Sequence, residues 1–290
     1  MLRDAGLGLA GTAALGLLAS SGSAAAATSA DLEILNFALN LEYLGAEYYL
    51  HAVTGQGLDA YVNIGFLGGT GRSVVAGGLV PFRTPAVAYF AQQLANDELA
   101  HVRFIQDLIA PGGFALPGVN AHEPRIDLSA TGAWTSFALA AGLIGAGQTF
   151  DPYRDEIAFL VGAYVLEDLC VSALAGAVAS LTNPDTIAYA AGLLGAEAYQ
   201  AGAIRGYLAD IGGGTATNAI SALRARLSGV GDEGTNAKNN PFNISNADVS
   251  AQAFRRTPQQ VLNVAFGASG TGVTQGLFFP FGVNGTIVST

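Results

Sequence analysis

Cysteine and charged residues are scarce in this chain of 290 residues. The single cysteine, Cys170, rules out an intrachain disulfide, so folding does not depend on an oxidising compartment. Charged residues make up 12% of the sequence, and an excess of acidic side chains gives a net charge of −10. Because the chain has no basic patch to displace counterions from phosphates, we expect no nucleic-acid partner.

Two catalytic patterns are also missing. No set of residues resembles a Ser-His-Asp nucleophile, and no Gly-rich phosphate loop stands between a strand and a helix. Hydrophobic residues make up 51% of the sequence, enough for a sizeable core. Residues 157–181 are apolar enough to resemble a transmembrane span, but Glu167 and Asp168 at their centre would be costly in lipid. We therefore expect a buried bundle helix there and no membrane span in the mature chain.

Residues 1–27 are typical of a signal peptide. Arg3 precedes an uncharged Gly/Ala/Leu-rich run, which ends in small residues that suit cleavage between Ala24 and Ala27. A disordered tail or an added amphipathic helix are the alternatives. The low hydrophobicity suits a twin-arginine leader, and a start codon assigned too far downstream would explain the missing Arg-Arg pair. We expect an exported protein, periplasmic or extracellular.

Four long apolar segments have apolar residues at every third or fourth position, as on one face of a helix. Each segment carries one glutamate at such a position. We expect helices from Thr28 or Ser29 to Thr54, from Pro85 to about Ala110, from near Pro152 to Asn183, and from Asp185 to Gly212. A step of three or four residues places the glutamates on the apolar faces of these helices. Removing a lone carboxylate from water costs several kcal/mol, so four in one core require protons or cations. The glutamates are Glu42, Glu98, Glu167 and Glu197.

Two of the four glutamates have a second polar residue three positions later: Glu98 with His101, and Glu197 with Gln200. This spacing puts both side chains of a pair on one helical face. Four carboxylates balance two divalent cations, and carboxylate with imidazole suits Fe or Mn better than thiolate-seeking metals. Di-iron and di-manganese carboxylate bundles use this constellation. We therefore predict an all-α four-helix bundle over residues 28–212, with Glu42, Glu98, His101, Glu167, Glu197 and Gln200 as metal ligands.

The motifs NLEYLGAEYY at residues 40–49 and NDELAH at residues 96–101 resemble the first two helices of ferritin-like proteins. Together with EAYQAGAIR at 197–205 and the terminal GLFFP at 276–280, they make the chain similar to the desiccation-related proteins over roughly residues 30–290. The resemblance implies a ferritin-like bundle, often exported, associated with stress and without a settled activity.

Gln200 departs from the ferritin-like pattern, which usually places histidine at this position. An amide oxygen coordinates more weakly than imidazole, so we expect one metal position to be weakened. The outcomes left open are two unequal sites, one occupied site, or a vestigial site with protonated glutamates.

Several residues near the predicted ligands have simpler interpretations. His101 would otherwise be a core histidine, and Glu47 is expected to be a solvated or interhelical charge. Cys170 is interpreted as small core filler, although it lies one turn past Glu167. Three tyrosines are expected to pack in the core, with a relay of electrons or protons as the alternative, and two histidines are expected in loops. These are Tyr43, Tyr49, Tyr164, His51 and His122.

Residues 213–290 are predicted to form a loop-rich extension with helices over 219–227 and 258–266. The Asn- and Gly-rich stretch 232–248 matches no defined calcium loop, and we interpret it as surface. The apolar segment 276–281 is expected to pack on the bundle or on a neighbouring subunit, and the partner it implies is a second copy of the chain or another protein.

Two functions follow from these patterns. The first is a metal-binding stress protein that turns over peroxide or oxygen at a Mn or Fe pair. The second is a metal-poor structural protein that protects other components during drying. A ferritin-style storage shell is weaker, because the long loops and the tail would obstruct its packing.

Overall fold

The computed structural model describes residues 27–61, 74–237 and 240–290, so the predicted signal peptide lies outside the described residues except for its last position. The fold is all-α, as predicted. Its long helices are α1 (Ser29–Thr54), α2 (Pro85–Ile109), α4 (Glu156–Val178) and α5 (Pro184–Asp210). The shorter ones are α3 (Thr135–Ala141), α6 (Gly214–Ser228) and α7 (Pro258–Phe266). Two-residue strands β1 (Val74–Val75) and β2 (Ile126–Asp127) pair in parallel.

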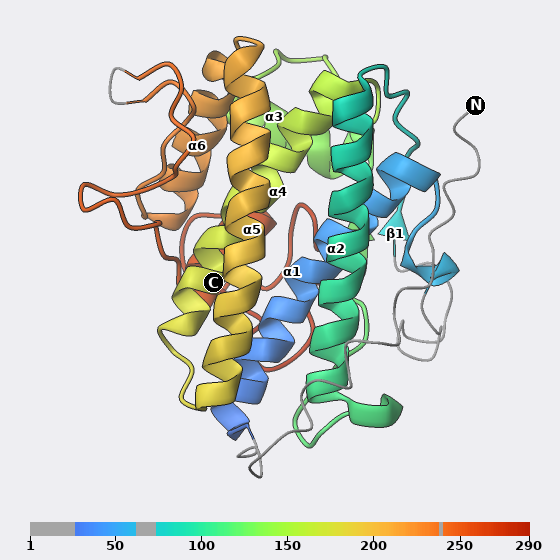
Figure 1. Cartoon of the computed structure of the whole chain (residues 1–290), viewed down its shortest axis with the longest axis vertical. Coiled ribbons are helices and arrows are strands. Elements are labelled where there is room, and N and C mark those ends of the chain that lie inside the picture. Colours follow the sequence, from blue (N-terminus) through green and yellow to red (C-terminus); the bar gives the residue numbers. More distant parts are fainter. Residues whose placement is uncertain (1–26, 62–73, 238–239) are drawn as a thin grey trace.

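The four long helices form two antiparallel hairpins, α1 with α2 and α4 with α5 (Figure 1). The connection that crosses between the two hairpins, residues 110–155, runs from the lower end of α2 to the upper end of α4. Four-helix bundles of the ferritin type have one such crossover. The start of α1 meets the end of α4, since Thr182 donates its backbone N–H to Asp31, and the end of α1 meets the start of α4 where Tyr48 stacks on Phe159. Helices α1 and α4 are therefore antiparallel.

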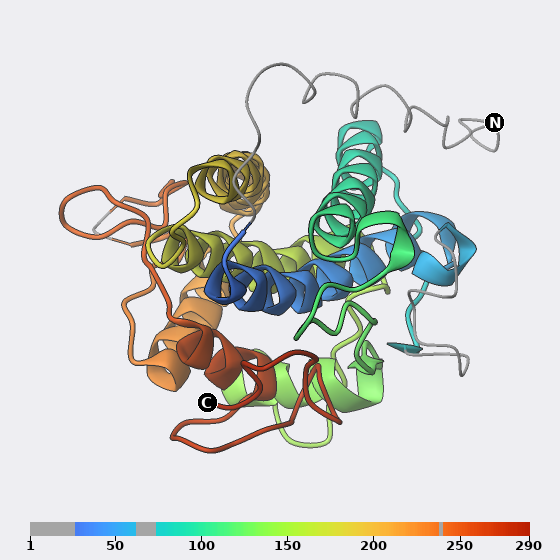
Figure 2. The same cartoon turned by 90° about the horizontal axis from the view of Figure 1, so that it is seen from below.

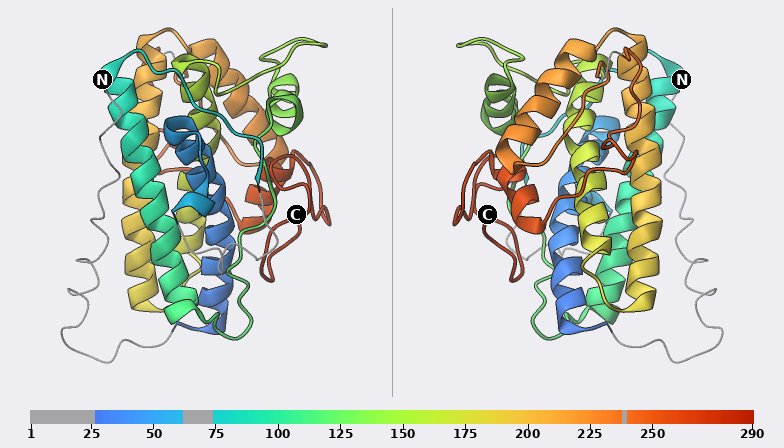
Figure 3. Two further views of the ribbon diagram at one scale, coloured as in Figure 1. Left: turned by 90° about the vertical axis from the view of Figure 1, so that its right-hand side faces the viewer. Right: turned by 90° about the vertical axis from the view of Figure 1, so that its left-hand side faces the viewer.

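The helices lie in three layers (Figures 2 and 3). Helices α1 and α4 form the middle layer, α2 and α5 cover one side, and α3, α6, α7 and the tail cover the other. A helix enclosed on both sides becomes apolar all round. This explains why α4, by length and composition, would pass for a membrane span, although 89% of its most apolar window is buried inside the protein.

Capping residues set the ends of the long helices. Thr28 accepts the backbone N–H of Asp31 at the start of α1, and Gly55 ends that helix with a left-handed φ of 75°. Asn183 caps α5, which begins at Pro184, one residue before the predicted Asp185.

Helix α4 is shorter than predicted at both ends. It begins at Glu156 rather than near Pro152, because the Asp155 carboxylate accepts the backbone N–H of Ala158 and makes Asp155 the N-cap. It ends at Val178, because the chain beyond it turns so that Thr182 and Asn183 donate their backbone N–H groups to the Asp31 carboxylate of α1.

The C-terminal extension packs on the middle layer of the same chain. Phe278 and Phe279 are buried, and Phe278 lies edge-on against Trp134 with ring centroids 4.9 Å apart. Asn40 of α1 exchanges two hydrogen bonds with the backbone of Asn284, at 2.8 and 3.0 Å. Phe281 remains 72% exposed. Helix α7 spans the predicted residues, whereas α6 begins five residues earlier than predicted.

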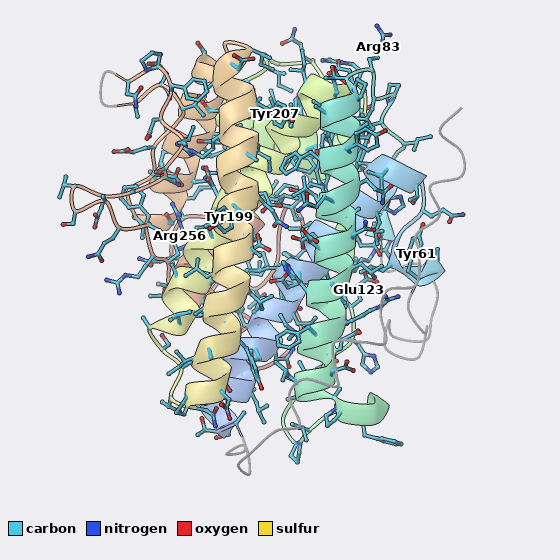
Figure 4. The ribbon with its side chains drawn as sticks, in the orientation of Figure 1. Tyr61, Arg83, Glu123, Tyr199, Tyr207 and Arg256 are labelled. Atoms are coloured by element: carbon cyan, nitrogen blue, oxygen red, sulfur yellow. The ribbon has the colours of Figure 1, made fainter. Side chains whose placement is uncertain are left out.

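A buried network of three arginines and two aspartates joins the extension to α4 and α5. Asp168 of α4 binds Arg205 at 2.8 Å and Arg224 at 2.7 Å. Asp232, beyond α6, binds Arg224 and Arg256, each at 2.9 Å. Figure 4 labels Arg256 on the side of the extension. Because each charge is paired, the network links the extension to the bundle without leaving an isolated ion in the core.

The predictions for two residues near the end of α1 were wrong. His51 lies in the last turn of α1 rather than in a loop. Glu47 is buried rather than solvated, and its partners lie in its own helix and the chain after it rather than in another long helix. Its Oε1 accepts the backbone N–H of Leu58, and its Oε2 lies 3.2 Å from Nε2 of His51. The chain that follows α1 folds back over the helix and covers both side chains. His122 lies in a loop, as predicted.

Candidate metal centre

The six predicted ligands all point into the bundle interior. Glu42 comes from α1, Glu98 and His101 from α2, Glu167 from α4, and Glu197 with Gln200 from α5. The exposed fraction of these residues ranges from 1% for Glu197 to 8% for His101. By contrast Tyr199, between the last two on α5, is 85% exposed (Figure 4). Helical periodicity thus places the polar residues on the buried faces.

Four of the six come together around one point. Glu42, Glu98, His101 and Glu197 each offer a ligand atom, and these atoms all lie within 4.8 Å of one another. Nδ1 of His101 is 3.2 Å from Glu197 Oε1, 3.3 Å from Glu42 Oε2 and 3.9 Å from Glu98 Oε1. A carboxylate-rich group with one imidazole has the donor chemistry of an Fe or Mn site.

Glu167 lies outside this tight group, next to Glu197. The hydroxyl of Tyr49 donates a hydrogen bond of 2.5 Å to its Oε1. Tyr49 is fully buried and packs edge-on against Tyr48, with ring centroids 5.1 Å apart. Tyr49 therefore holds one carboxylate oxygen, a contact that the core-packing interpretation missed. Tyr49 follows Glu42 by seven residues, two turns along the same helical face. This spacing could have indicated that it lies near the predicted ligands.

Gln200 is held by a residue that sequence reasoning did not select. Its Nε2 donates to Oδ2 of Asp97, 3.0 Å away on α2, next to Glu98. This hydrogen bond fixes the orientation of the amide and leaves Oε1 buried with no hydrogen-bond partner. Gln200 thus offers its oxygen, the atom able to bind a cation. No periodic signal marked Asp97, because it lies beside the apolar stripe of α2.

Whether these residues fit a metal can be tested from the hydrogen bonds of their buried polar atoms. Five of the predicted ligands carry six buried polar atoms that make no hydrogen bond: Oε2 of Glu42, Nδ1 of His101, Oε2 of Glu167, both carboxylate oxygens of Glu197, and Oε1 of Gln200. Buried polar groups in folded proteins are almost always satisfied, and an unsatisfied one costs about 1–3 kcal/mol. Electron-pair donors concentrated at one place fit cations that accept from all of them.

The pKa values of the buried groups also show that the site requires protons or cations. Burial raises the pKa of Glu98 far above its usual range, and the neighbouring charges of Glu197 and Glu42 raise it further. The pKa of Glu167 is likewise raised, first by burial and then by Glu197. Burial alone would lower the pKa of His101, but the carboxylates of Glu197 and Glu42, 3.2 and 3.3 Å from its Nδ1, outweigh burial and raise the pKa to about 11. Without cations, the site holds protons.

A glycine makes room for one of the glutamates. A Cβ at Gly45 of α1 would lie 2.5 Å from Oε2 of Glu98. Any larger residue at this position would push the Glu98 side chain away. Gly45 is therefore part of the site, although its type alone gave no such indication.

A four-helix bundle with one long crossover and buried Glu and His residues from all four helices defines a ferritin-like carboxylate bundle. The chain belongs to the ferritin-like family, because the family profile described as ferritin-like domain matches residues 30–210.

Two relatives narrow this assignment. The chain is 31% identical over 278 residues to the ferritin-like catalase Nec2 of Nesocodon mauritianus, covering 89% of this chain and 85% of the relative. It is 32% identical over 252 residues to the desiccation-related protein PCC13-62 of Craterostigma plantagineum, covering 80% and 76%. No solved structure matches the chain at a significant level. The predicted membership of the desiccation-related group is therefore confirmed.

Proposed function

We propose that this protein binds two Mn or Fe ions in the bundle core and decomposes peroxide there, as part of a stress response. The observation that carries the proposal is the set of six buried, unpartnered donor atoms on five of the six predicted ligands. The similarity to a protein named ferritin-like catalase supports peroxide, rather than dioxygen, as the substrate.

The described side chains suggest how the ligands would be divided between the two ions. Glu42, Glu98, His101 and Glu197, whose donor atoms meet within 4.8 Å, would hold one ion. Glu167 and the amide oxygen of Gln200 would extend the ligand set toward the second. Because an amide oxygen replaces an imidazole, the second ion would be held more weakly. The metal pair would supply the two-electron redox change that peroxide disproportionation requires.

The protein's own groups would manage protons. Disproportionation of two peroxide molecules to dioxygen and two waters moves protons from one peroxide to the other. The pair of Tyr49 and Glu167 is suited to take and return such a proton, because the Tyr49 hydroxyl is hydrogen-bonded to Oε1 of Glu167 and leaves Oε2 for the metal. The surrounding apolar core keeps bulk water away from this transfer.

Oxygen evolution from peroxide tests the proposal. We expect the protein reconstituted with Mn or Fe to evolve dioxygen, and Glu98→Ala to abolish this together with metal binding. Glu33→Ala, at an exposed position near the start of α1, is the matched control and should retain both. Metal bound in the expected amount without oxygen evolution would reject the catalytic part of the proposal.

The alternative is a non-catalytic protective protein with a vestigial site. The replacement of histidine by Gln200 and the raised pKa values of Glu98 and Glu167 favour it, because protonated glutamates could remain buried without cations. In that case the extension would act as an interaction surface, with the exposed Phe281 reaching a neighbouring subunit. Absence of both metal and oxygen evolution would support this function.

Export is also part of the proposal. The composition of residues 1–27 supports a cleaved signal peptide. Mass spectrometry of the protein recovered from the periplasm or medium should show a mature N-terminus between Ala24 and Thr28. An intact N-terminus on cytoplasmic protein would contradict export.

A further inference from the structure

A pocket between α1 and α4 reaches the metal centre from the lower half of the bundle. Its cavity volume is about 10 Å³, room for about one molecule of the size of water, and it is partly open to solvent. Glu42, the only ionisable carboxylate among the described residues that line it, has an unpartnered oxygen and is 2% exposed. The other side chains that matter here are Phe37 and Ala38 of α1, and Cys170, Ala173 and Ala177 of α4.

The lining residues run in order from the surface to the site. Because α1 and α4 are antiparallel, Ala38 lies near Ala177 at one end, and Glu42 lies near Cys170 at the other. Ala177 is partly exposed and marks the mouth. Cys170 keeps part of its surface accessible, whereas Ala173 and Leu174, between it and Ala177, are buried. The pocket therefore leads from solvent to the Glu42 side of the ligand group.

The walls determine what can pass. Small alanines leave the space open, and phenylalanine and leucine side chains supply apolar walls. An ion would lose its hydration in such a passage and gain no countercharge before Glu42, which itself repels anions. A small uncharged molecule such as hydrogen peroxide loses far less.

We propose that this pocket is the entry route for small uncharged molecules to the Glu42 side of the centre, with hydrogen peroxide as its occupant in the working protein. The choice of peroxide rests on the proposed function. The passage of uncharged molecules does not, so the two can fail separately.

Cys170 reports on the passage because it is the single cysteine of the chain. The experiment compares its modification by uncharged methyl methanethiosulfonate and by the anionic sulfonatoethyl reagent, using the full-length protein. We expect the anionic reagent to react more than about tenfold slower with folded protein, because an ion must enter an apolar passage. The difference should disappear in denaturant. Burial raises the pKa of the thiol and slows both reagents alike, so only their ratio is interpreted.

Blocking the mouth tests the route itself. Ala177→Phe should slow the uncharged reagent about tenfold and raise the KM for peroxide, with kcat and metal content unchanged. Ala188→Phe, at an exposed position of α5 outside the pocket, should change none of these. If circular dichroism shows that Ala177→Phe misfolds, Ala177→Leu takes its place with smaller shifts in the same direction.

Several results would overturn the inference. Equal rates for both reagents, or no modification of folded protein, would show that no selective passage reaches Cys170. Slower labelling of Ala177→Phe with an unchanged KM would show that peroxide enters elsewhere. Selective labelling that Ala177→Phe blocks, in a protein that evolves no oxygen, would reject the proposed function and keep the route for uncharged molecules.

Discussion

The hydroxyl of Tyr49 donates a 2.5 Å hydrogen bond to Oε1 of Glu167, while Oε2 of the same carboxylate is buried without a partner. Gln200 shows the same arrangement, since Asp97 accepts from its Nε2 and its Oε1 has no partner. In both cases a neighbour fixes one atom and leaves the other atom available. Such supporting contacts orient metal ligands and commonly change metal affinity by about 10–100-fold when removed.

Tyr49→Phe should weaken metal binding without unfolding the protein. Loss of the hydrogen bond frees Glu167 to rotate, so we expect metal affinity to fall at least about tenfold. Tyr48→Phe is the matched control, because its hydroxyl donates to the backbone oxygen of Phe159 rather than to a ligand. Both variants should lose about 1 kcal/mol of stability. Isothermal titration calorimetry with Mn or Fe measures the metal affinity of both variants. Equal affinities would show that Tyr49 serves packing alone.

Gln200→His should strengthen the weaker metal position. An imidazole is a better ligand than an amide oxygen, and Asp97 is in place to accept its N–H. We expect a second equivalent of metal to bind more tightly, whereas Gln200→Leu should lose it. Titration monitored by elemental analysis of dialysed protein measures both. Identical stoichiometry in all three proteins would place Gln200 outside the ligand set.

Gly45→Ala should disturb the site through Glu98. The new methyl group would lie 2.5 Å from Oε2 of Glu98, so the carboxylate must move. We expect metal affinity to fall about tenfold or more. Gly192→Ala is the control, because nothing lies within 4 Å of a Cβ at this exposed position of α5, and alanine should stabilise the helix by up to about 1 kcal/mol. Normal affinity in Gly45→Ala would contradict the packing described here.

The sequence predicted the helices and the ligand stripe because both depend on local periodicity. The predicted cap Thr28 and the predicted end at Gly55 are both found in α1. The predictions that failed concern contacts between parts of the chain that are separate in the sequence. Asp97 resembles a surface residue until α5 brings Gln200 to it, and Glu47 resembles a solvated charge until the chain after α1 covers it. Tertiary packing alone creates these environments.

The arrangement of the helices in three layers was also not predicted from the sequence. Helix α4 is buried on nearly all sides and has no polar face toward solvent, because the extension covers the face opposite α5. The expectation that the tail packs on the bundle or on a neighbour left this choice open. The hydrogen bonds of Asn40 with Asn284 place the tail on its own chain.

Acid should destabilise the protein through Asp232. Burial alone would raise the pKa of this carboxyl, but Arg224 and Arg256 outweigh it and lower the pKa below the usual value. The native state therefore binds fewer protons than the unfolded state just below pH 4, near the unfolded pKa of about 3.9. The stabilisation is complete above the unfolded pKa and is lost as the pH falls through the folded one.

Asp232→Asn measures this contribution. At pH 7 it should cost about 3–5 kcal/mol, because it leaves Arg224 and Arg256 buried with too little countercharge. The difference from the wild type in urea unfolding should shrink as the pH falls below about 4. Asp107→Asn, at an exposed position of α2, should change stability by less than about 0.5 kcal/mol. A difference that does not change with pH would contradict the ionic role of Asp232.

The central claim is that the bundle glutamates hold a metal pair, and elemental analysis tests it most directly. The protein should be purified from its native compartment without added metal or affinity-tag histidines. We predict close to two equivalents of Mn or Fe per chain, lost in Glu98→Ala with the helical circular dichroism spectrum intact. Less than about a tenth of an equivalent, with a melting temperature unchanged on adding Mn or Fe, would contradict the account, because a bound metal must stabilise the folded state.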